Sequence, residues 1–239
     1  MNIWVILPTY NERANIGPIV SRLFALAPDL HVLVVDDNSP DGTASAVASL
    51  QETFPGLELL SRTGERGFGS AYLAGFRRVL ETGPADLILM MDADLSHDPA
   101  HIPAMLERIS DCDAVIGSRY TKGGGVAGWE LWRRLLSRAG NAYIRAITRM
   151  PFRDCTSGFI LIRADLLSRL DLSGINCSGY AFLMEIKYAM WRAHARVSEV
   201  PIIFRNRAEG ESKLSGHIVA EGIRAPWNVR SAGRRRNLP

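Results

Sequence analysis

Apolar residues along this chain form two kinds of pattern. Short unbroken runs are typical of buried strands, whereas an apolar residue at every third or fourth position is typical of a helix. The runs predict strands over residues 3–7, 31–35, 57–60, 87–91, 114–117, 160–162 and 196–200. The periodic stretches predict helices over residues 16–27, from 43 onward, from 70 through 79, and over 103–109, 129–150, 164–170 and 182–192. Strands that alternate with helices favour an α/β fold, with a mostly parallel central sheet and helices on both faces.

The composition limits the class of protein. With 239 residues, 47% of them hydrophobic, the chain is expected to form one domain over residues 1–225, followed by a basic tail over 226–239. No run approaches the roughly 18 apolar residues of a membrane span, and the first residues lack the basic start of a signal peptide. The three cysteines form no C-x-x-C pair, which favours a reduced cytoplasmic protein without a zinc site. A net charge of +3 does not suggest a nucleic-acid partner.

The run at 87–91 ends directly in two acids, Asp92 and Asp94. Ligands of open α/β sheets bind outside the carboxyl ends of the strands, and residues i and i+2 of an extended chain face the same side. Two neighbouring carboxylates repel each other unless a cation lies between them, and Mg²⁺ binds one or two carboxylates together with substrate phosphates. The pair therefore indicates a metal–diphosphate site. The alternative is that Asp94 only caps a turn before Pro99.

The first two strands also end in polar turns. Pro8 stops the first strand, and Asn15 is expected to cap the helix after it. Asp36 and Asp37 follow the second strand, and Asp41 is expected to cap the next helix. No G-x-G-x-x-G follows the first strand, which argues against a dinucleotide-binding domain. The glycine run at 123–125 predicts either a loop that closes over a substrate or an exposed linker.

The segment 129–150 has two distinct sides. At 100° per residue, one stripe is apolar: Trp129, Trp132, Leu136, Ala139, Tyr143, Ile147 and Met150. The opposite stripe is basic: Arg134, Arg138, Arg145 and Arg149. Tryptophan beside a basic face is typical of a helix at a membrane surface, an interpretation that Arg234, Arg235 and Arg236 strengthen. A helix that covers the core with a solvated arginine face would look the same, and Gly140-Asn141 could divide it in two.

Six motifs occur in a fixed order across roughly residues 3–215. They are P-T-Y-N-E at 8–12, D-D-N-S-P-D-G-T at 36–43, D-A-D at 92–94, G-S-R-Y at 117–120, T-S-G-F at 156–159 and R-A-E-G-E-S-K at 207–213. Together they resemble the family-2 glycosyltransferases of GT-A fold, in particular the dolichyl- or polyprenyl-phosphate mannose synthases. One such motif is weak evidence, but six in register are specific.

The resemblance implies a role for each matching position. The donor nucleotide would contact Pro8, Tyr10, Glu12, Val35, Asp37, Asp92, Ala93, Asp94, Arg207 and Lys213. The acceptor phosphate would contact Arg119, Arg133 and Ser137, and the metal would contact Asp92, Asp94 and Ser96. Asp92, Asp94 and Arg119 would be the catalytic residues. Some relatives carry Gln at the position of Ser96, so this shorter side chain is expected to reach the metal only through water.

The resemblance also implies an activity. It is the inverting transfer of mannose from GDP-mannose to a polyprenyl or dolichyl monophosphate, with Mg²⁺ or Mn²⁺ as cofactor. Several relatives carry membrane spans that this chain lacks. It is therefore expected to act as a peripheral protein at the cytoplasmic face of the membrane, alone or with a membrane-embedded partner.

The chemistry supports this without the resemblance. A phosphate monoester with a second pKa near 6 is ionised at neutral pH, so it is its own nucleophile and needs charge compensation more than a base. Two alternatives stay open: a UDP-glucose-dependent lipid-phosphate glucosyltransferase, and a non-catalytic subunit that binds sugar nucleotides. The complete set of Asp92, Asp94, Arg119 and Lys213 speaks against the second.

Overall fold

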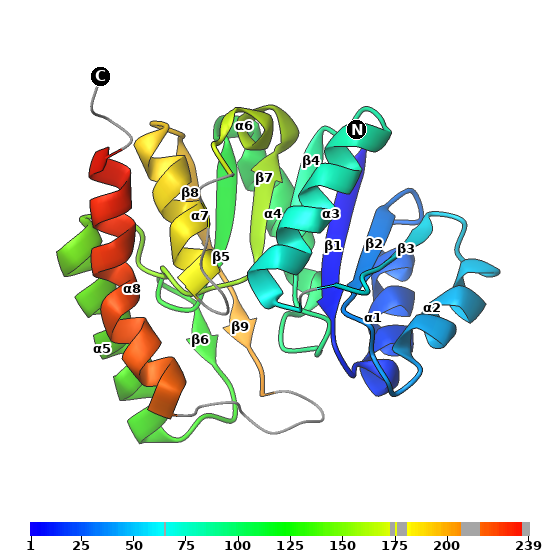
Figure 1. Cartoon of the computed structure of the whole chain (residues 1–239), viewed down its shortest axis with the longest axis horizontal. Helices are drawn as coiled ribbons and strands as arrows, with labels where there is room; N and C mark the ends of the chain where they lie inside the picture. The colour runs from blue at the N-terminus through cyan, green and yellow to red at the C-terminus, as the bar shows by residue number, and fades with distance from the viewer. Residues whose placement is uncertain (65, 173–174, 176–180, 207–215, 236–239) are drawn as a thin grey trace.

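The structure is a computed structural model that describes residues 1–64, 66–172, 175, 181–206 and 216–235 (Figure 1). Seven strands of the described chain form the main sheet, in the order β3-β2-β1-β4-β7-β5-β8. They are β1 (Ile3–Thr9), β2 (His31–Asp36), β3 (Leu57–Ser61), β4 (Leu87–Met90), β5 (Ala114–Ser118), β7 (Ile160–Arg163) and β8 (Val197–Pro201). The pairings are parallel except those of β7, which is antiparallel to β4 and β5. The predicted mostly parallel sheet is confirmed.

Helices cover both faces of this sheet. One face is covered by α1 (Arg13–Leu26), α2 (Thr43–Gln51) and α4 (Ile102–Arg108). Two short 3-10 turns, η1 (Pro99–His101) and η2 (Ile109–Asp111), flank α4. The other is covered by α3 (Phe68–Thr82), α6 (Ala164–Arg169) and α7 (Ala181–Arg192). Beyond α7 lie α5 (Leu131–Thr148) and α8 (Gly216–Arg235), side by side in Figure 1.

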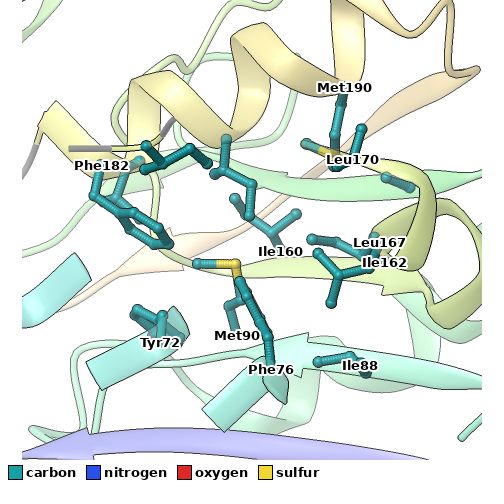
Figure 2. Close-up of a cluster of buried hydrophobic side chains, with 14 of the residues drawn as sticks. Tyr72, Phe76, Ile88, Met90, Ile160, Ile162, Leu167, Leu170, Phe182 and Met190 are labelled. Atoms are coloured by element: carbon teal, nitrogen blue, oxygen red, sulfur yellow. The ribbon is translucent and has the colours of Figure 1, made fainter. Parts of the chain in front are cut away.

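Each strand contributes side chains to two hydrophobic cores, one on either side of the sheet, because successive side chains point to opposite faces. On β4, Ile88 and Met90 enter one core, while Leu87 and Leu89 enter the other. Figure 2 shows the first core, in which Phe182 of α7 lies with the α3 and sheet side chains. The double burial explains why the central strands read as unbroken apolar runs.

The strand order determines where a ligand can bind. From β1 the chain builds outward to β2 and β3, then returns to place β4 on the other side of β1. In open α/β sheets, ligands bind at such a reversal, which here lies at the carboxyl ends of β1 and β4. Because β7 runs antiparallel, residues 156–159, which precede it, lie at the same edge of the sheet.

Helix starts agree with the prediction in part. Asp41 lies one residue before the N-cap of α2, which is Gly42, but its carboxylate does accept the backbone N–H of Thr43 at 2.9 Å and that of Arg13 at 3.0 Å. The prediction for Asn15 is wrong, because α1 begins at Arg13 and Asn15 lies inside it. Asn15 instead donates to the Glu12 carboxylate at 2.7 Å.

The glycine run is not an exposed linker throughout. Gly125 belongs to strand β6 (Gly125–Val126), which pairs with β9 (Ile203–Phe204). At Gly124, a Cβ atom would lie only 2.5 Å from the Ser118 carbonyl oxygen, so only glycine allows this close backbone approach. The linker interpretation is therefore wrong for Gly124 and Gly125.

Within the segment 129–150, residues Leu131–Thr148 form one unbroken helix, α5, which continues through Gly140 and Asn141. The predicted apolar stripe does not lie on one face. Ile147 and Met150 are buried at 6% and 2% exposure, whereas Trp132 is 56% exposed. The helix therefore presents a core-facing side, an exposed apolar side and an exposed arginine side. A second long helix, α8, was not predicted, and a domain boundary at residue 225 falls inside it.

Candidate active site

The residues expected to bind the donor nucleotide gather at the carboxyl ends of β1 and β2. Pro8 pairs with Val35 in the parallel register of the two strands. Tyr10 lies just beyond β1, and Glu12 caps α1. The backbone N–H of Asp37 donates to the Thr9 carbonyl at 3.0 Å, which holds the two strand ends together.

Two arginines that the sequence analysis did not single out complete this region. The Asp37 carboxylate accepts Nη1 of Arg62 at 2.7 Å and the backbone N–H of Gly67 at 2.9 Å. The guanidinium of Arg66 lies 4.6 Å from the centroid of the Tyr10 ring and donates to its hydroxyl at 2.8 Å. The turn before α3 is thus fixed against the ends of β1 and β2. Each arginine contacts a residue that was predicted to bind the donor nucleotide.

The acid pair follows β4 directly, as predicted. Asp94 is 4% exposed, and its Oδ1 accepts both the backbone N–H of Ser96, at 3.0 Å, and the Ser96 hydroxyl, at 2.5 Å. Leu95 between them has a φ of 63°, a left-handed conformation that turns Ser96 back toward Asp94. The Ser96 hydroxyl therefore orients the carboxylate, and its predicted metal contact stays a prediction.

His97 is hydrogen-bonded to the backbone of the other acid, Asp92. Its Nδ1 accepts the backbone N–H of Asp92 at 3.1 Å, and its ring stacks on Phe159 with a centroid distance of 5.0 Å. Burial lowers the pKa of His97 to about 4, so the ring is neutral at pH 7. The sequence analysis missed this residue, although it follows Asp94 by only three positions.

The carboxylate oxygens that follow β4 are suitable ligands for a hard divalent cation. Within the described ranges, no group of three or more His, Cys, Asp or Glu residues could hold a metal by itself. Asp92 and Asp94 offer carboxylate oxygens only, and the side chain of Asp92 is 23% exposed. Mg²⁺ and similar ions complete such a site with water and substrate phosphate oxygens.

Arg119, at the end of β5, is held by a buried carboxylate. Its Nε and Nη2 donate to the two oxygens of Asp154 at 2.8 and 2.7 Å, and Nη2 also donates to the Thr156 hydroxyl at 2.7 Å. Burial alone would lower the pKa of Arg119, but the Asp154 carboxylate outweighs it and the net shift is upward. Burial would likewise raise the pKa of Asp154, but Arg119 lowers it to about 2. Both groups are charged at neutral pH.

The other two predicted acceptor residues lie beside Arg119. The guanidinium of Arg133 lies 4.3 Å from the centroid of the Trp129 ring, and that of Arg119 lies 5.7 Å from the same centroid. Ser137, one helical turn after Arg133, accepts the Tyr120 hydroxyl at 2.6 Å. The structure thus brings together all three residues expected to bind the acceptor phosphate. The Asp92 carboxylate also raises the pKa of Arg119, because the two charges are near each other.

A buried lysine and an asparagine fix the loop that carries Asp154. Nζ of Lys187 donates to the carbonyls of Cys155, at 3.3 Å, and Ser157, at 2.5 Å. Burial lowers the pKa of this lysine to about 8. Oδ1 of Asn141 accepts the Cys155 backbone N–H at 2.7 Å, so α5 is bonded to the same loop. Nothing in the local sequence pattern indicates these long-range contacts.

Arg207 and Lys213, expected to grip the donor diphosphate, lie outside the described residues. The described chain reaches the site just before them. The backbone N–H of Arg205 donates to the Ser96 carbonyl at 3.1 Å, and Asn206 donates to the Gly128 carbonyl at 2.8 Å. The roles of Arg207 and Lys213 stay predictions.

Comparison with solved structures supports the fold. Glucosyl-3-phosphoglycerate synthase from Mycobacterium tuberculosis matches with a TM-score of 0.71 at 19% identity, over 96% of this chain and 80% of that one. The mannosyltransferase PcManGT from Pyrobaculum calidifontis, solved with GDP-Man and Mn²⁺, matches with a TM-score of 0.63 at 20% identity, over 100% of this chain and 65% of that one. The GT-A fold is thereby confirmed.

Comparison with curated sequences gives the family. The chain is 41% identical to the undecaprenyl-phosphate mannosyltransferase of Micrococcus luteus, over 93% of this chain and 91% of that one. It is 40% identical to the polyprenol monophosphomannose synthase of Mycolicibacterium smegmatis, over 95% and 86%. The model of the family described as "Glycosyl transferase family 2" matches residues 4–171. The chain belongs to glycosyl transferase family 2.

Proposed function

We propose that this protein transfers mannose from GDP-mannose to a polyprenyl monophosphate at a membrane surface, with inversion at the anomeric carbon. One observation carries the proposal: an acidic pair, Asp92 and Asp94, lies at the same sheet edge as the cations Arg119 and Arg133. Such an arrangement suits a reaction in which two anions must meet. The names of the relatives support mannose as the sugar and a polyprenyl phosphate as the acceptor.

The donor would bind at the ends of β1, β2 and β4. Asp92 and Asp94 would hold Mg²⁺ or Mn²⁺, which, when bound, neutralises charge on the diphosphate leaving group. Ser96 and His97 keep the two acids in place by the bonds described above. Tyr10 and Asp37 would contact the nucleoside, with Arg66 and Arg62 behind them.

The acceptor would bind between Arg119, Arg133 and Ser137. An oxygen of its phosphate attacks the anomeric carbon and forms the new C–O bond. The bond from that carbon to the GDP oxygen breaks, and its electron pair leaves with GDP. No proton needs to be removed, because the phosphate monoester is already ionised at neutral pH. The protein contributes position and charge compensation, which are large terms when water is excluded.

A direct assay tests this activity. The protein is incubated with radiolabelled GDP-mannose and a polyprenyl phosphate in detergent, with Mg²⁺, with Mn²⁺ or with a chelator. We expect label in the lipid fraction only when a divalent metal is present. UDP-glucose in place of GDP-mannose is the matched control. Labelling from UDP-glucose but not from GDP-mannose would contradict the proposed donor.

The route to a lipid substrate is an exposed apolar surface on α5 and α8. We define it by these residues: Leu131, Trp132, Leu135, Leu136, Tyr143, Ile223 and Trp227. Leu131 is 71% exposed, and Trp132 and Trp227 are 56% and 57% exposed. Tyr143 joins the two helices, because its hydroxyl donates to the Ile223 carbonyl at 2.9 Å and accepts Nε1 of Trp227 at 3.0 Å.

A basic flank on α5 borders this apolar surface. It consists of Arg134, Arg138, Arg145 and Arg149, all exposed. Apolar side chains next to arginines are suited to the boundary between acyl chains and anionic headgroups. No helix among the described residues has the length and apolarity to cross a bilayer. The apolar surface and its basic flank support our proposal of peripheral attachment at the cytoplasmic face, alone or with a membrane-embedded partner.

Vesicle binding tests the attachment. Replacing Trp132 and Trp227 with Ser should reduce co-sedimentation with vesicles that contain anionic lipid and slow transfer to a long-chain acceptor. In the matched control, Ser replaces Leu26 and Leu80, which lie on other helices and are 39% and 37% exposed. That control should bind vesicles like the wild type. Equal binding by all three proteins would contradict the role of the apolar surface.

A further inference from the structure

Trp129 does not lie on the exposed apolar surface, where the sequence pattern placed it. Its ring packs edge-on against Phe204 of β9 with a centroid distance of 5.7 Å. It precedes the first residue of α5 and is only partly exposed. The expectation that this indole sits in the bilayer interface is therefore wrong for the described structure. What the ring does contact is the pair of guanidinium groups of Arg119 and Arg133.

These two guanidiniums present a problem of charge. Arg119 is neutralised by Asp154 at 2.7 Å, whereas Arg133 forms no ion pair with any described carboxylate. Arg133 therefore needs another attractive partner to stay beside Arg119. The negative face of an indole ring attracts a cation within about 6 Å of its centroid, and both arginines meet that limit, at 4.3 and 5.7 Å.

The polar atom of the same indole is also unusual. Nε1 of Trp129 is buried, and no acceptor in the described part of the chain takes its hydrogen. A buried donor without a partner is costly, so such groups commonly find one in a ligand or in water. An oxygen of a phosphate bound by the two arginines would supply the missing acceptor.

We propose that Trp129 is a positioning residue of the acceptor-phosphate site. Its ring holds Arg133 close to Arg119, so that both cations can grip one phosphate, and its N–H donates to a phosphate oxygen. This inference rests on the proposed function, because it presumes that the two arginines bind the acceptor. It assigns Trp129 to phosphate recognition and leaves membrane contact to the apolar surface.

A graded series of substitutions tests the idea without a membrane. Trp129→Tyr, Trp129→Phe and Trp129→Leu are assayed with a short, water-soluble isoprenyl phosphate. The strength of the cation–ring attraction falls from Trp through Tyr and Phe, and Leu has none. We expect the KM for the acceptor to rise in that order, by about tenfold or more for Leu, which matches the usual worth of such a contact. The KM for GDP-mannose should stay within about twofold.

Two controls separate this role from packing and from membrane contact. Leu80→Ala removes a partly exposed apolar side chain of α3, outside the acceptor site and the apolar surface, and should leave the KM for the soluble acceptor unchanged. In an Arg133→Gln background, Trp129→Phe should raise that KM less than it does in the wild type, because only the N–H contact, and no longer the hold on Arg133, is left to be lost. Thermal unfolding of each variant shows whether it is folded, and the Phe and Tyr variants carry the test if Leu is not.

The outcomes are distinct. The inference is overturned if Trp129→Phe and Trp129→Leu keep the wild-type KM for the soluble acceptor, or if their defects appear only with vesicles. Calorimetric titration with the same isoprenyl phosphate, without donor, separates this inference from the proposed activity. Binding weakened about tenfold by Trp129→Leu supports the positioning role even if the wild type transfers no mannose. Absence of transfer by the wild type contradicts the proposed function alone.

Discussion

The two halves of the candidate active site are built in different ways. At the donor edge, Asp92, Asp94, Ser96 and His97 lie within six consecutive residues after one strand, and they brace one another. On the acceptor side, Arg119 depends on Asp154, and Trp129 depends on Phe204. The donor edge is thus a local feature of one turn, whereas the acceptor side exists only when distant segments have packed together.

The halves also differ in how their charge is balanced. Arg119 carries its own buried counter-ion, so its charge is compensated before any ligand binds. At the donor edge, the Ser96 hydroxyl orients Asp94, and His97, whose pKa is lowered to about 4 by burial, accepts the backbone N–H of Asp92. The acceptor side is therefore the half whose charge balance is built into the fold, and the donor edge is the half at which the proposed metal would bind.

The sharpest way to break this contrast is to remove one acid. Asp94→Asn should lower transfer about a thousandfold, which corresponds to ~4 kcal/mol, because diphosphate charge then goes uncompensated. The unfolding midpoint should change little, since Asn keeps the size and one acceptor oxygen. Steady-state assays at saturating metal provide the measurement, and Asp98→Asn on the same loop is the control. Near-normal turnover of Asp94→Asn in chelator would refute the metal role.

The opposite behaviour is expected of Asp154. Asp154→Asn leaves the Arg119 charge buried without its counter-ion, which should cost about 3–5 kcal/mol of unfolding free energy. Denaturant unfolding provides the measurement. Asp113→Asn is the matched control, because Asp113 pairs with Arg196, whose side chain is 68% exposed, and its loss should matter much less. Equal destabilisation by the two variants would show that the buried pair is not special.

The acceptor side should also show its dependence on the fold as a function of pH. The pKa of Lys187 is about 8 in the folded chain and 10.5 in the unfolded one, so the unfolded chain holds this proton more tightly. Stability should therefore rise as the pH increases from 8 to 10.5, by about 3 kcal/mol from this group, and fall again as the pH returns through 8. Denaturant titrations of the wild type and Lys187→Met across that range should differ in slope. Parallel curves would contradict the assignment.

A smaller effect separates the two halves kinetically. Replacing both Arg133 and Ser137 with Ala should raise the KM for the lipid phosphate by about 10- to 100-fold, equivalent to ~1–3 kcal/mol. The KM for GDP-mannose should be nearly unchanged, because neither side chain lies at the ends of β1, β2 or β4. Initial rates with each substrate varied in turn provide the measurement. A loss of GDP-mannose affinity would show that the halves are not independent.

Sequence reasoning succeeded where the signal is local. The strands were predicted because a sheet covered by helices on both faces requires unbroken apolar runs. The acids at their ends were predicted because polar residues directly after a strand can be recognised from the local sequence alone. The hydrogen bond of Asp41 at the start of α2 was anticipated for the same reason, although the N-cap residue is Gly42. His97 could have been found from its place directly after the acid pair, but the pattern does not reveal the bond to Asp92.

The remaining features arise from tertiary contacts. Helix α8 contains Gly222 and Pro226, which both oppose helix formation, and it is stabilised by burial of Ala225 and Val229 at 3% and 4% exposure. The division of α5 into three sides depends on α8 as well. Periodicity alone separated apolar from basic residues, but it could not separate core-facing apolar residues from exposed ones.

The geometry of α5 has a consequence for the depth at which the protein works. Trp132 of the apolar surface is adjacent in sequence to Arg133, and Leu136 is adjacent to Ser137. Neighbouring residues of a helix differ by only about 1.5 Å along its axis, so Arg133 and Ser137, the proposed phosphate contacts, begin at the same level along α5 as the exposed apolar side chains. An isoprenoid chain could pass from the phosphate site directly onto the apolar surface without crossing the helix. A phosphate held by Arg133 and Ser137 would therefore lie at the depth of these apolar side chains, so α5 would determine how deeply the protein enters the headgroup region.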